Sequence, residues 1–193
     1  MSTANTQSSS APPPAQAEDR PACRTLAALA DRLISLTAEP SLAEINAWVR
    51  EVRVERAELE PFVQFKDTCY SRRRVVRGEH AELLIICWRP GQRTPIHDHD
   101  GSYGTVRVCE GVMWETIFGM EDARGLAYRM GREWRAGETT AGADIPDIHQ
   151  IGNPDISGQN LITLHLYAPP LTSLNIYRVG HTDSEFTPSV EIE

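Results

Sequence analysis

The pattern of apolar positions divides the chain into a helical part and a longer part rich in strands. In the first part, leucines recur at helical spacing: Leu26, Leu29, Leu33 and Leu36. Ser41 and Glu44 have the spacing of a capping box, which predicts a second helix with an inner face formed by Ile45, Val49 and Val52. A third short helix is predicted for residues 57–65. Leucine stripes are typical of core packing, so we expect the helices to cover one face or end of a sheet.

From Cys69 onward the pattern changes to short strands. Strands are predicted at 69–76 and 82–88, and a Gly78-Glu79 turn joins them. Further strands are predicted at 104–109, 112–118, 126–130, 133–135, 139–143, 149–152, 161–167 and 173–179. Turn signals separate them, including one at Gly131-Arg132. Many short strands at regular spacing indicate a mostly β fold, a double-sheet jelly roll or barrel with N-terminal helices.

The length of 193 residues indicates one domain with appendages. Residues 1–22 are rich in Ser, Ala, Pro and Gln, which predicts a disordered tail. Residues 23–66 form the helical part and residues 67–180 the barrel. Residues 181–193 are acidic, and we expect a loosely held C-terminal tail.

Charge and composition narrow the class of protein. The net charge of −8 and the lack of basic runs argue against binding to nucleic acid or to an anionic membrane surface. No apolar run reaches 18 residues, and the N-terminus lacks the features of a signal peptide. The four cysteines form no Cys-x-x-Cys pair, which favours reduced thiols in a cytoplasmic protein. We expect a monomer or a weak homo-oligomer; the sequence does not decide between them.

The candidate chemistry begins at His97 and His99, which follow a Pro/Gly turn. Side chains two residues apart on a strand point to the same face, at a separation of about 7 Å along the strand. Two imidazoles placed in this way can both reach one metal ion. An isolated His-x-His in a loop usually has no such role, so the surrounding spacing decides the interpretation.

That spacing resembles the cupin motifs. The segment from Gly91 to Gly111 matches the first motif, G(X)5HXH(X)3-4E(X)6G, except that Gly104 replaces its glutamate. His149 and Asn153 match the end of the second motif, H(X)3N, although the rest of that motif is degenerate. Without the motif, a histidine inside a sheet with its hydrogen bonds satisfied would be an equally good interpretation of His149.

A larger set of segments resembles the cysteine dioxygenases in order and spacing. These segments are Tyr70-Ser-Arg72, Cys87-Trp-Arg-Pro-Gly91, Thr94-Pro-Ile-His-Asp-His99, Val108-Cys-Glu-Gly111, Ile148-His149 and Thr163-Leu-His-Leu-Tyr-Ala-Pro-Pro170. The resemblance covers roughly residues 70–177, the whole cupin part, and it implies an Fe(2+) site formed by His97, His99 and His149. Three neutral imidazoles suit ferrous iron and leave positions open for substrate and oxygen. With Gly104 in place of a carboxylate, the site keeps its full positive charge, which favours binding of a thiolate.

The strand at 161–167 carries a second candidate constellation. Thr163, His165 and Tyr167 alternate along it, so they face the same side. The family has a Ser-His-Tyr relay at these positions, and threonine keeps the hydroxyl that a relay needs. The resemblance implies that Tyr167 hydrogen-bonds substrate or bound oxygen; an interior polar ladder without a catalytic part is the alternative.

The resemblance also bears on a covalent cross-link that some members of the family contain. The animal dioxygenases carry a cysteine at the position of Gly104, cross-linked to the tyrosine that matches Tyr167. Cys109 would face the opposite side of a regular strand. We therefore expect Tyr167 to be free of a cross-link, as in bacterial members of the family.

Arg72 is the candidate for substrate specificity. The matching arginine of the cysteine dioxygenases pairs with the substrate carboxylate, a geometry that suits a guanidinium. Tyr70 shares its face of the strand, and so does Arg74, which is the alternative ligand if the register is shifted by two. The related mercaptopropionate dioxygenases carry glutamine at this position. Trp88 fits either the pocket or the core, and the core is favoured.

These features together predict a dioxygenase that oxidises a small thiol, L-cysteine first, to its sulfinic acid with O2. A 3-mercaptopropionate dioxygenase is the nearest alternative. A non-catalytic cupin that senses a metal or a thiol would need an output domain, which the polar N-terminal tail is not. A zinc- or nickel-dependent cupin isomerase would typically keep the motif glutamate that is absent here.

Overall fold

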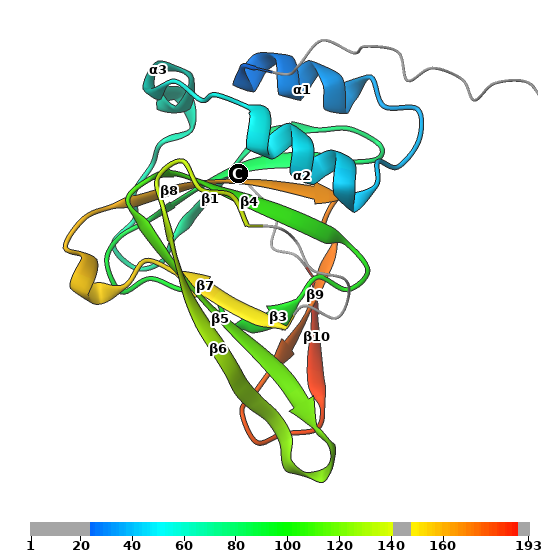
Figure 1. Cartoon of the computed structure of the whole chain (residues 1–193), viewed down its shortest axis with the longest axis vertical. Coiled ribbons are helices and arrows are strands. Elements are labelled where there is room, and N and C mark those ends of the chain that lie inside the picture. Colours follow the sequence, from blue (N-terminus) through cyan, green and yellow to red (C-terminus); the bar gives the residue numbers. More distant parts are fainter. Residues whose placement is uncertain (1–23, 141–147, 189–193) are drawn as a thin grey trace, which may run out of the picture.

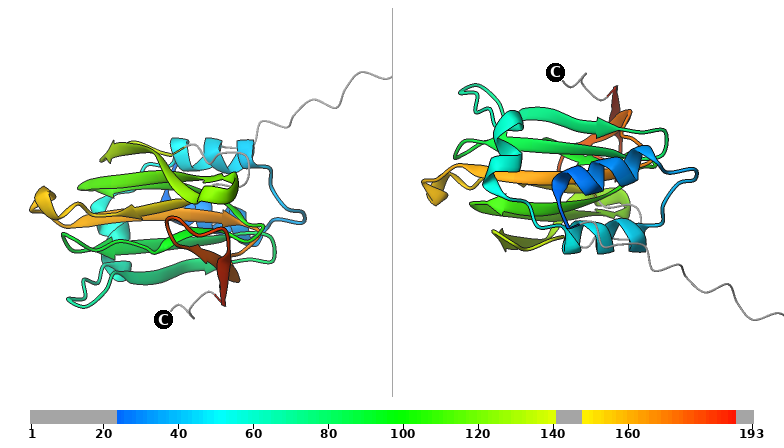
Figure 2. Two further views of the ribbon diagram at one scale, coloured as in Figure 1. Left: turned by 90° about the horizontal axis from the view of Figure 1, so that it is seen from below. Right: turned by 90° about the horizontal axis from the view of Figure 1, so that it is seen from above.

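The computed structural model describes residues 24–140 and 148–188. The predicted N-terminal tail therefore lies outside the described residues. Within the described ranges, no helix is long and apolar enough to cross a membrane. The described chain forms two antiparallel sheets that enclose a barrel, with helices on one outer face (Figures 1 and 2).

The predicted helices are present. α1 (Leu26–Ile34) is capped by the Thr25 side chain, and α2 (Leu42–Glu51) begins with the predicted capping box of Ser41 and Glu44. The predicted third helix is shorter, with α3 (Arg56–Leu59) followed by the 3-10 helix η1 (Glu60–Phe62). α1 and α2 lie across the outside of one sheet (Figure 2). Their leucine and valine stripes pack with that sheet in one buried cluster.

The sheet beneath the helices has four strands in the order β1-β2-β8-β4. They are β1 (Ser71–Arg77), β2 (Glu82–Trp88), β4 (Tyr103–Glu110) and β8 (Leu161–Ala168). Every residue of β2 and β8 is buried, as the apolar run of residues 83–88 predicts. Alternate side chains of β8 therefore face the helices or the barrel interior. Leu164 belongs to the cluster beneath the helices, and Tyr167 belongs to the interior cluster.

The second sheet has six strands in the order β10-β9-β3-β7-β5-β6. They are β3 (Ile96–Asp98), β5 (Val112–Glu121), β6 (Gly125–Arg135), β7 (His149–Gly152), β9 (Ser173–Tyr177) and β10 (Ser184–Pro188). The 3-10 helices η2 (Asp122–Arg124) and η3 (Asp155–Ser157) lie in connections. β5 and β6 form a long hairpin that extends past the barrel (Figure 1).

The structure corrects the prediction of a turn at Gly131-Arg132. Residues 126–130 and 133–135 belong to the single strand β6, in which Gly131 pairs with Thr116. The glycine has a packing reason instead, because a Cβ there would lie 2.4 Å from the ring of Trp114. The glycine thus leaves room for an indole, and it does not end the strand.

Two further differences concern weakly patterned segments. In the predicted strand 139–143, Thr139 forms only an isolated bridge with Arg107, and residues 141–143 lie outside the described residues. After residue 180, where we expected a loosely held tail, β10 pairs with β9 along its whole length. Most side chains of β10 are exposed, so its position rests on backbone hydrogen bonds that the apolar pattern does not reveal.

Candidate metal centre and substrate cavity

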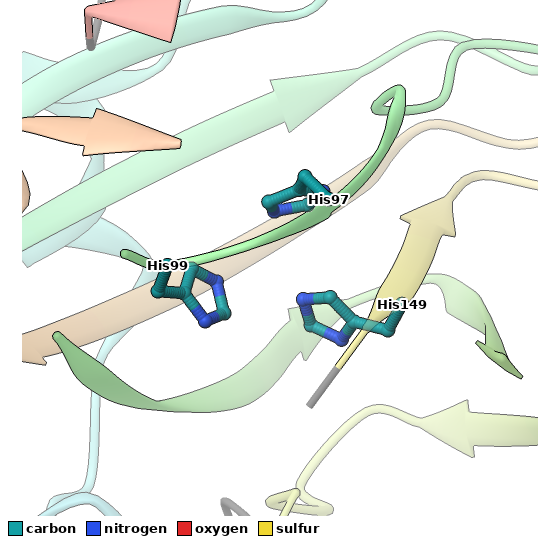
Figure 3. Close-up of side chains that lie close together, drawn as sticks. All are labelled: His97, His99 and His149. Atoms are coloured by element: carbon teal, nitrogen blue, oxygen red, sulfur yellow. The ribbon is translucent and has the colours of Figure 1, made fainter. Parts of the chain in front are cut away.

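Three histidines converge inside the barrel. His97 lies on β3, His99 directly follows that strand, and His149 lies on β7, where it pairs with His97. One ring nitrogen of each histidine lies within 4.8 Å of the others. The ring centroids are 4.9 to 5.1 Å apart, and the rings surround a common space (Figure 3). Short strands from two parts of the chain thus bring the three predicted ligands together.

Hydrogen bonds at the far side of two rings decide which nitrogen faces this space. His97 Nδ1 lies 3.0 Å from the carbonyl oxygen of Pro95, and His149 Nδ1 lies 2.9 Å from Glu115 Oε1. A proton on each Nδ1 satisfies these acceptors, so each Nε2 keeps a free lone pair. His149 Nε2 is buried and has no hydrogen-bond partner among the described residues. This unpartnered nitrogen fits a metal ion at the centre of the three rings.

Burial keeps the imidazoles of His97 and His99 uncharged. Desolvation, with the nearby His149, lowers the pKa of His97 to about 3. Desolvation and the neighbouring histidines lower the pKa of His99 well below its ordinary value. A metal ion binds neutral imidazole, so these groups need to lose no proton near neutral pH before they bind it.

Asp98, which lies between the first two histidines, fixes the β3 segment to β9. Its carboxylate accepts hydrogen bonds from Tyr177 Oη at 2.6 Å, from Asn175 Nδ2 at 2.9 Å and from the Asp100 backbone N–H at 2.9 Å. Partial burial alone would raise the pKa of Asp98, but these hydrogen bonds outweigh it and hold the pKa below its usual value. Asp100 continues the clamp, because it accepts a hydrogen bond from Ser173 Oγ.

A cavity of about 220 Å³ opens beside His97, one of the three clustered histidines. Its polar part is formed by Tyr70, Arg72, His97, His165 and Tyr167. Apolar side chains of β9 and residues 187–188 of β10 also line the cavity. The strand that the sequence did not predict therefore closes part of this cavity.

The three polar residues of β8 form one hydrogen-bonded row in the interior. His165 Nε2 lies 2.8 Å from Thr163 Oγ1, and His165 Nδ1 lies 3.1 Å from Tyr167 Oη. Trp88 Nε1 donates to Thr163 Oγ1 at 2.9 Å. Since the indole can only donate, Thr163 accepts from it and can donate its own proton to His165. His165 then donates to Tyr167, whose hydroxyl proton is free to point into the cavity.

Tyr167 remains a protonated phenol under ordinary conditions. Burial raises its pKa to about 12, although the positive charge of Arg72 opposes the shift. Its ring centroid lies 5.2 Å from that of His99. Burial, with the positive charge of Arg72, lowers the pKa of His165 well below its ordinary value, so the ring is neutral. The row thus presents a hydrogen-bond donor next to the histidines.

The two candidate arginines of β1 have different surroundings. Arg72 lines the cavity, and its Nε is buried without a hydrogen-bond partner among the described residues. Arg74 is more exposed, and its Nε lies 3.7 Å from the buried carboxylate of Glu82. Tyr70 lies beside Arg72 in the cavity and stacks on Trp88, with a centroid distance of 4.4 Å. Of the two arginines, Arg72 is the one that lines the cavity.

Gly104 is held free of a side chain by Tyr167. A Cβ at this position would lie 2.7 Å from two atoms of the Tyr167 ring. Neither the glutamate of the cupin motif nor a cysteine fits there unless the tyrosine moves. Cys109 packs with the cluster beneath the helices, whereas Tyr167 belongs to the interior cluster.

All eight predicted site residues lie at the histidine cluster, the cavity or the row of β8. Sequence reasoning missed the carboxylate of Glu115 behind His149, and it favoured the core for Trp88, which also donates to Thr163. Glu115 lies two residues after the buried Met113, at an inward position of a predicted strand. A carboxylate at such a position is a signal that could have identified it.

Comparison with known proteins identifies the family. A family model described as cysteine dioxygenase type I matches residues 16–179. The chain belongs to the cysteine dioxygenase family. It is 28% identical to cysteine dioxygenase type 1 of Rattus norvegicus over 82% of each chain, and 29% identical to that of Danio rerio over 62% of each. A solved protein of Klebsiella pneumoniae with a double-stranded β-helix domain has 17% identity and a TM-score of 0.48, covering 69% of this chain and 89% of that one. Membership of the cysteine dioxygenase family, with the three-histidine site, supports a non-haem metal dioxygenase.

Proposed function

We propose that this protein is an iron(II)-dependent thiol dioxygenase that oxidises L-cysteine with O2 to cysteine sulfinic acid. The observation that carries the proposal is that His97 and Arg72 line one cavity. His97, His99 and His149 would hold the iron, since three neutral nitrogen donors suit a ferrous ion and leave positions open. When bound, iron supplies the place where the substrate sulfur and O2 react. The family match supports this chemistry.

Arg72 selects the substrate in this proposal. Its guanidinium faces the cavity with an unpartnered buried Nε, so a substrate carboxylate would satisfy it. Arg74 is the weaker candidate, because it already faces the carboxylate of Glu82. An arginine in place of the glutamine of mercaptopropionate dioxygenases favours cysteine over 3-mercaptopropionate.

The row on β8 controls a proton beside the reacting atoms. Thr163 and His165 orient the Tyr167 hydroxyl, and the raised pKa of Tyr167 keeps its proton in place. The phenol can therefore donate a hydrogen bond to substrate or to oxygen, and burial strengthens this bond by excluding water. The chain's own part in catalysis is thus to orient the substrate and to supply this donor.

The cysteines of the chain agree with a reducing compartment. Cys69, Cys87 and Cys109 are free thiols in the part of the chain that the structure describes. We infer a cytoplasmic enzyme that acts on a small thiol and O2, with neither nucleic acid nor membrane as a partner.

The test is oxygen consumption by anaerobically iron-loaded protein with L-cysteine, 3-mercaptopropionate and cysteamine, with the sulfinate identified by mass. Cysteamine has no carboxylate and serves as the substrate control. Arg72→Gln is expected to lower kcat/KM for L-cysteine by about 30- to 1000-fold, because it removes a buried charge-assisted pair of roughly 2–4 kcal/mol. Turnover of cysteamine should change much less. The matched variant Arg74→Gln should leave both substrates nearly unaffected.

Three outcomes contradict parts of the proposal. Equal losses for L-cysteine and cysteamine in Arg72→Gln would remove its role as carboxylate ligand. A wild-type preference for 3-mercaptopropionate would change the substrate and keep the chemistry. No oxygen consumption with any of the three thiols would overturn the dioxygenase assignment.

A further inference from the structure

A buried carboxylate stands behind one of the three histidines. Glu115 Oε1 lies 2.9 Å from His149 Nδ1, and Glu115 Oε2 accepts a hydrogen bond from Trp134 Nε1 at 2.8 Å. His149 and Glu115 are only 5% and 7% exposed. Each carboxylate oxygen thus has one nitrogen partner from a neighbouring strand.

Strand register places these groups together. His149 on β7 pairs with Ile117 on β5, so Glu115 lies two residues along the same strand and shares its face. Trp134 on β6 pairs with Met113 and approaches Glu115 from the other side. The guanidinium of Arg132 stacks 4.3 Å above the Trp134 ring, which restrains the indole. Three neighbouring strands therefore fix the position of one carboxylate.

We propose that Glu115 is a positioning residue that sets the tautomer and orientation of His149 for metal binding. An ionised carboxylate accepts a hydrogen bond from Nδ1–H but has no proton to donate, so the lone pair must lie on Nε2. The unpartnered Nε2 of His149 faces the common space of the three rings. This inference rests on the metal site of the proposed function.

The carboxylate of Glu115 also places a negative charge near the three histidines, where the cupin motif would have a glutamate. The motif glutamate is replaced by Gly104, and the ring of Tyr167 leaves no room for a side chain there. Glu115 supplies one negative charge through His149 without occupying a ligand position. A metal ion held by the three neutral histidines would thus have one compensating negative charge nearby, and the positions that face the cavity would stay open for substrate.

Because Trp134 also donates to Glu115, replacing one carboxylate oxygen by an NH2 group should change the tautomer of His149. In Glu115→Gln, the side chain has one acceptor oxygen and one donor NH2 group, whereas both neighbours present N–H groups in the wild type. The indole can only donate, so it takes the oxygen of the glutamine. The NH2 group then faces His149 Nδ1, which must become an acceptor and shift its proton to Nε2. That proton occupies the lone pair that the metal needs.

The experiment titrates metal-free protein with Co²⁺ and follows the visible absorption of the bound ion. Co²⁺ binds nitrogen sites at least as tightly as Fe²⁺, and this readout requires no turnover. Glu115→Gln should weaken binding by about 10- to 100-fold. Trp134→Phe should weaken it less. The double variant should bind more tightly than Glu115→Gln alone, because without the indole the glutamine oxygen can turn to His149. Losses that simply multiply in the double variant would contradict the proposed tautomer control.

Glu82→Gln is the matched control, since Glu82 is also buried and accepts hydrogen bonds, but on β2 of the other sheet. It should leave Co²⁺ affinity unchanged even if it lowers stability. Nitrogen NMR of the metal-free wild type gives a measurement that needs no variant: the proton of His149 is expected on Nδ1. A proton on Nε2, or wild-type affinity in Glu115→Gln, would overturn the inference. Failure of the wild-type protein itself to bind Co²⁺ would instead overturn the proposed metal site.

Discussion

The two sheets of the barrel hold their functional side chains by different physical means. The four-stranded sheet has helices on one face and the barrel interior on the other, and β2 and β8 are buried along their whole length. Packing on both faces therefore fixes the row of Thr163, His165 and Tyr167. The six-stranded sheet carries the proposed metal ligands at or beside β3 and β7, which have only three and four residues. Hydrogen bonds to Asp98 and Glu115 fix these short strands and their rings.

Because the two sheets are held in different ways, we expect them to tolerate different substitutions. A packed sheet depends on side-chain volume, because its interior has few voids to absorb a change. A polar clamp depends on charge and on the match of donors to acceptors. Loss of volume in the first sheet should therefore lower stability, and loss of a partner in the second should alter the metal site first.

The largest expected effect separates metal binding from folding. His149→Ala removes one of the three clustered imidazoles, so it should weaken metal binding strongly. The loss should exceed the factor of about 10 to 100 that is expected when only a residue that orients a ligand is removed. The four-stranded sheet should stay folded. Iron stoichiometry after anaerobic reconstitution and circular dichroism measure the two effects. His181→Ala removes a histidine with a 56% exposed side chain and is the control. Stoichiometric iron in His149→Ala would mean that the third ligand is another residue.

A substitution in the packed sheet should have the opposite result: lower stability with unchanged metal binding. Leu164 is completely buried beneath the helices, so Leu164→Ala should lower the free energy of unfolding by about 2–5 kcal/mol. The metal affinity of the folded protein should not change, because Leu164 faces away from the barrel interior. Denaturant unfolding and Co²⁺ titration measure the two quantities. Ile156→Ala, at a side chain that is 96% exposed, should cost less than about 0.5 kcal/mol. A large loss of metal affinity in Leu164→Ala would show that metal binding by the six-stranded sheet depends on packing in the four-stranded sheet.

The smallest expected effect concerns the clamp at Asp98 and its dependence on pH. The folded pKa of Asp98 is lowered, so its stabilisation is fully present above about pH 4 and is lost as the pH falls through the folded pKa. Asp98→Asn should lower stability at pH 7 by about 1 kcal/mol, a modest value because the carboxylate is partly exposed. The difference from wild type should shrink below pH 4. Urea unfolding of wild type and variant at pH 7 and below pH 4 measures this difference in stability. An equal difference at the two pH values would contradict the role of the charge.

The sequence predicts the parts of the fold that depend on burial. The helix stripes, the buried strand β2 and the common direction of His97 and His99 all follow from periodicity, and the structure confirms them. The strand β10 does not follow, because its side chains are mostly exposed and only its backbone binds β9. Gly131 gave a false turn signal because its purpose is to leave room for a ring from the neighbouring strand.

The site shows the same limit at the level of single residues. Alternation places Arg72 and Arg74 on one face of a strand, so it cannot say which of them reaches the cavity. Their different neighbours come from tertiary structure, since Glu82 lies on the adjacent strand and faces Arg74. The partner of His149 is 34 residues away in the chain, on a strand whose register no local pattern fixes. Local patterns thus predict which residues are suited to chemistry, and pairing between strands decides their partners.

The position of β10 has a consequence for where the chain can be shortened. The three histidines and the row of β8 lie between residues 97 and 167, whereas Thr187 and Pro188 of the cavity wall come later in the chain. A chain that ends before β10 would therefore keep all three histidines and lose part of the cavity wall. Loss of this strand should impair the enclosure of a substrate more directly than it impairs the grouping of the three rings.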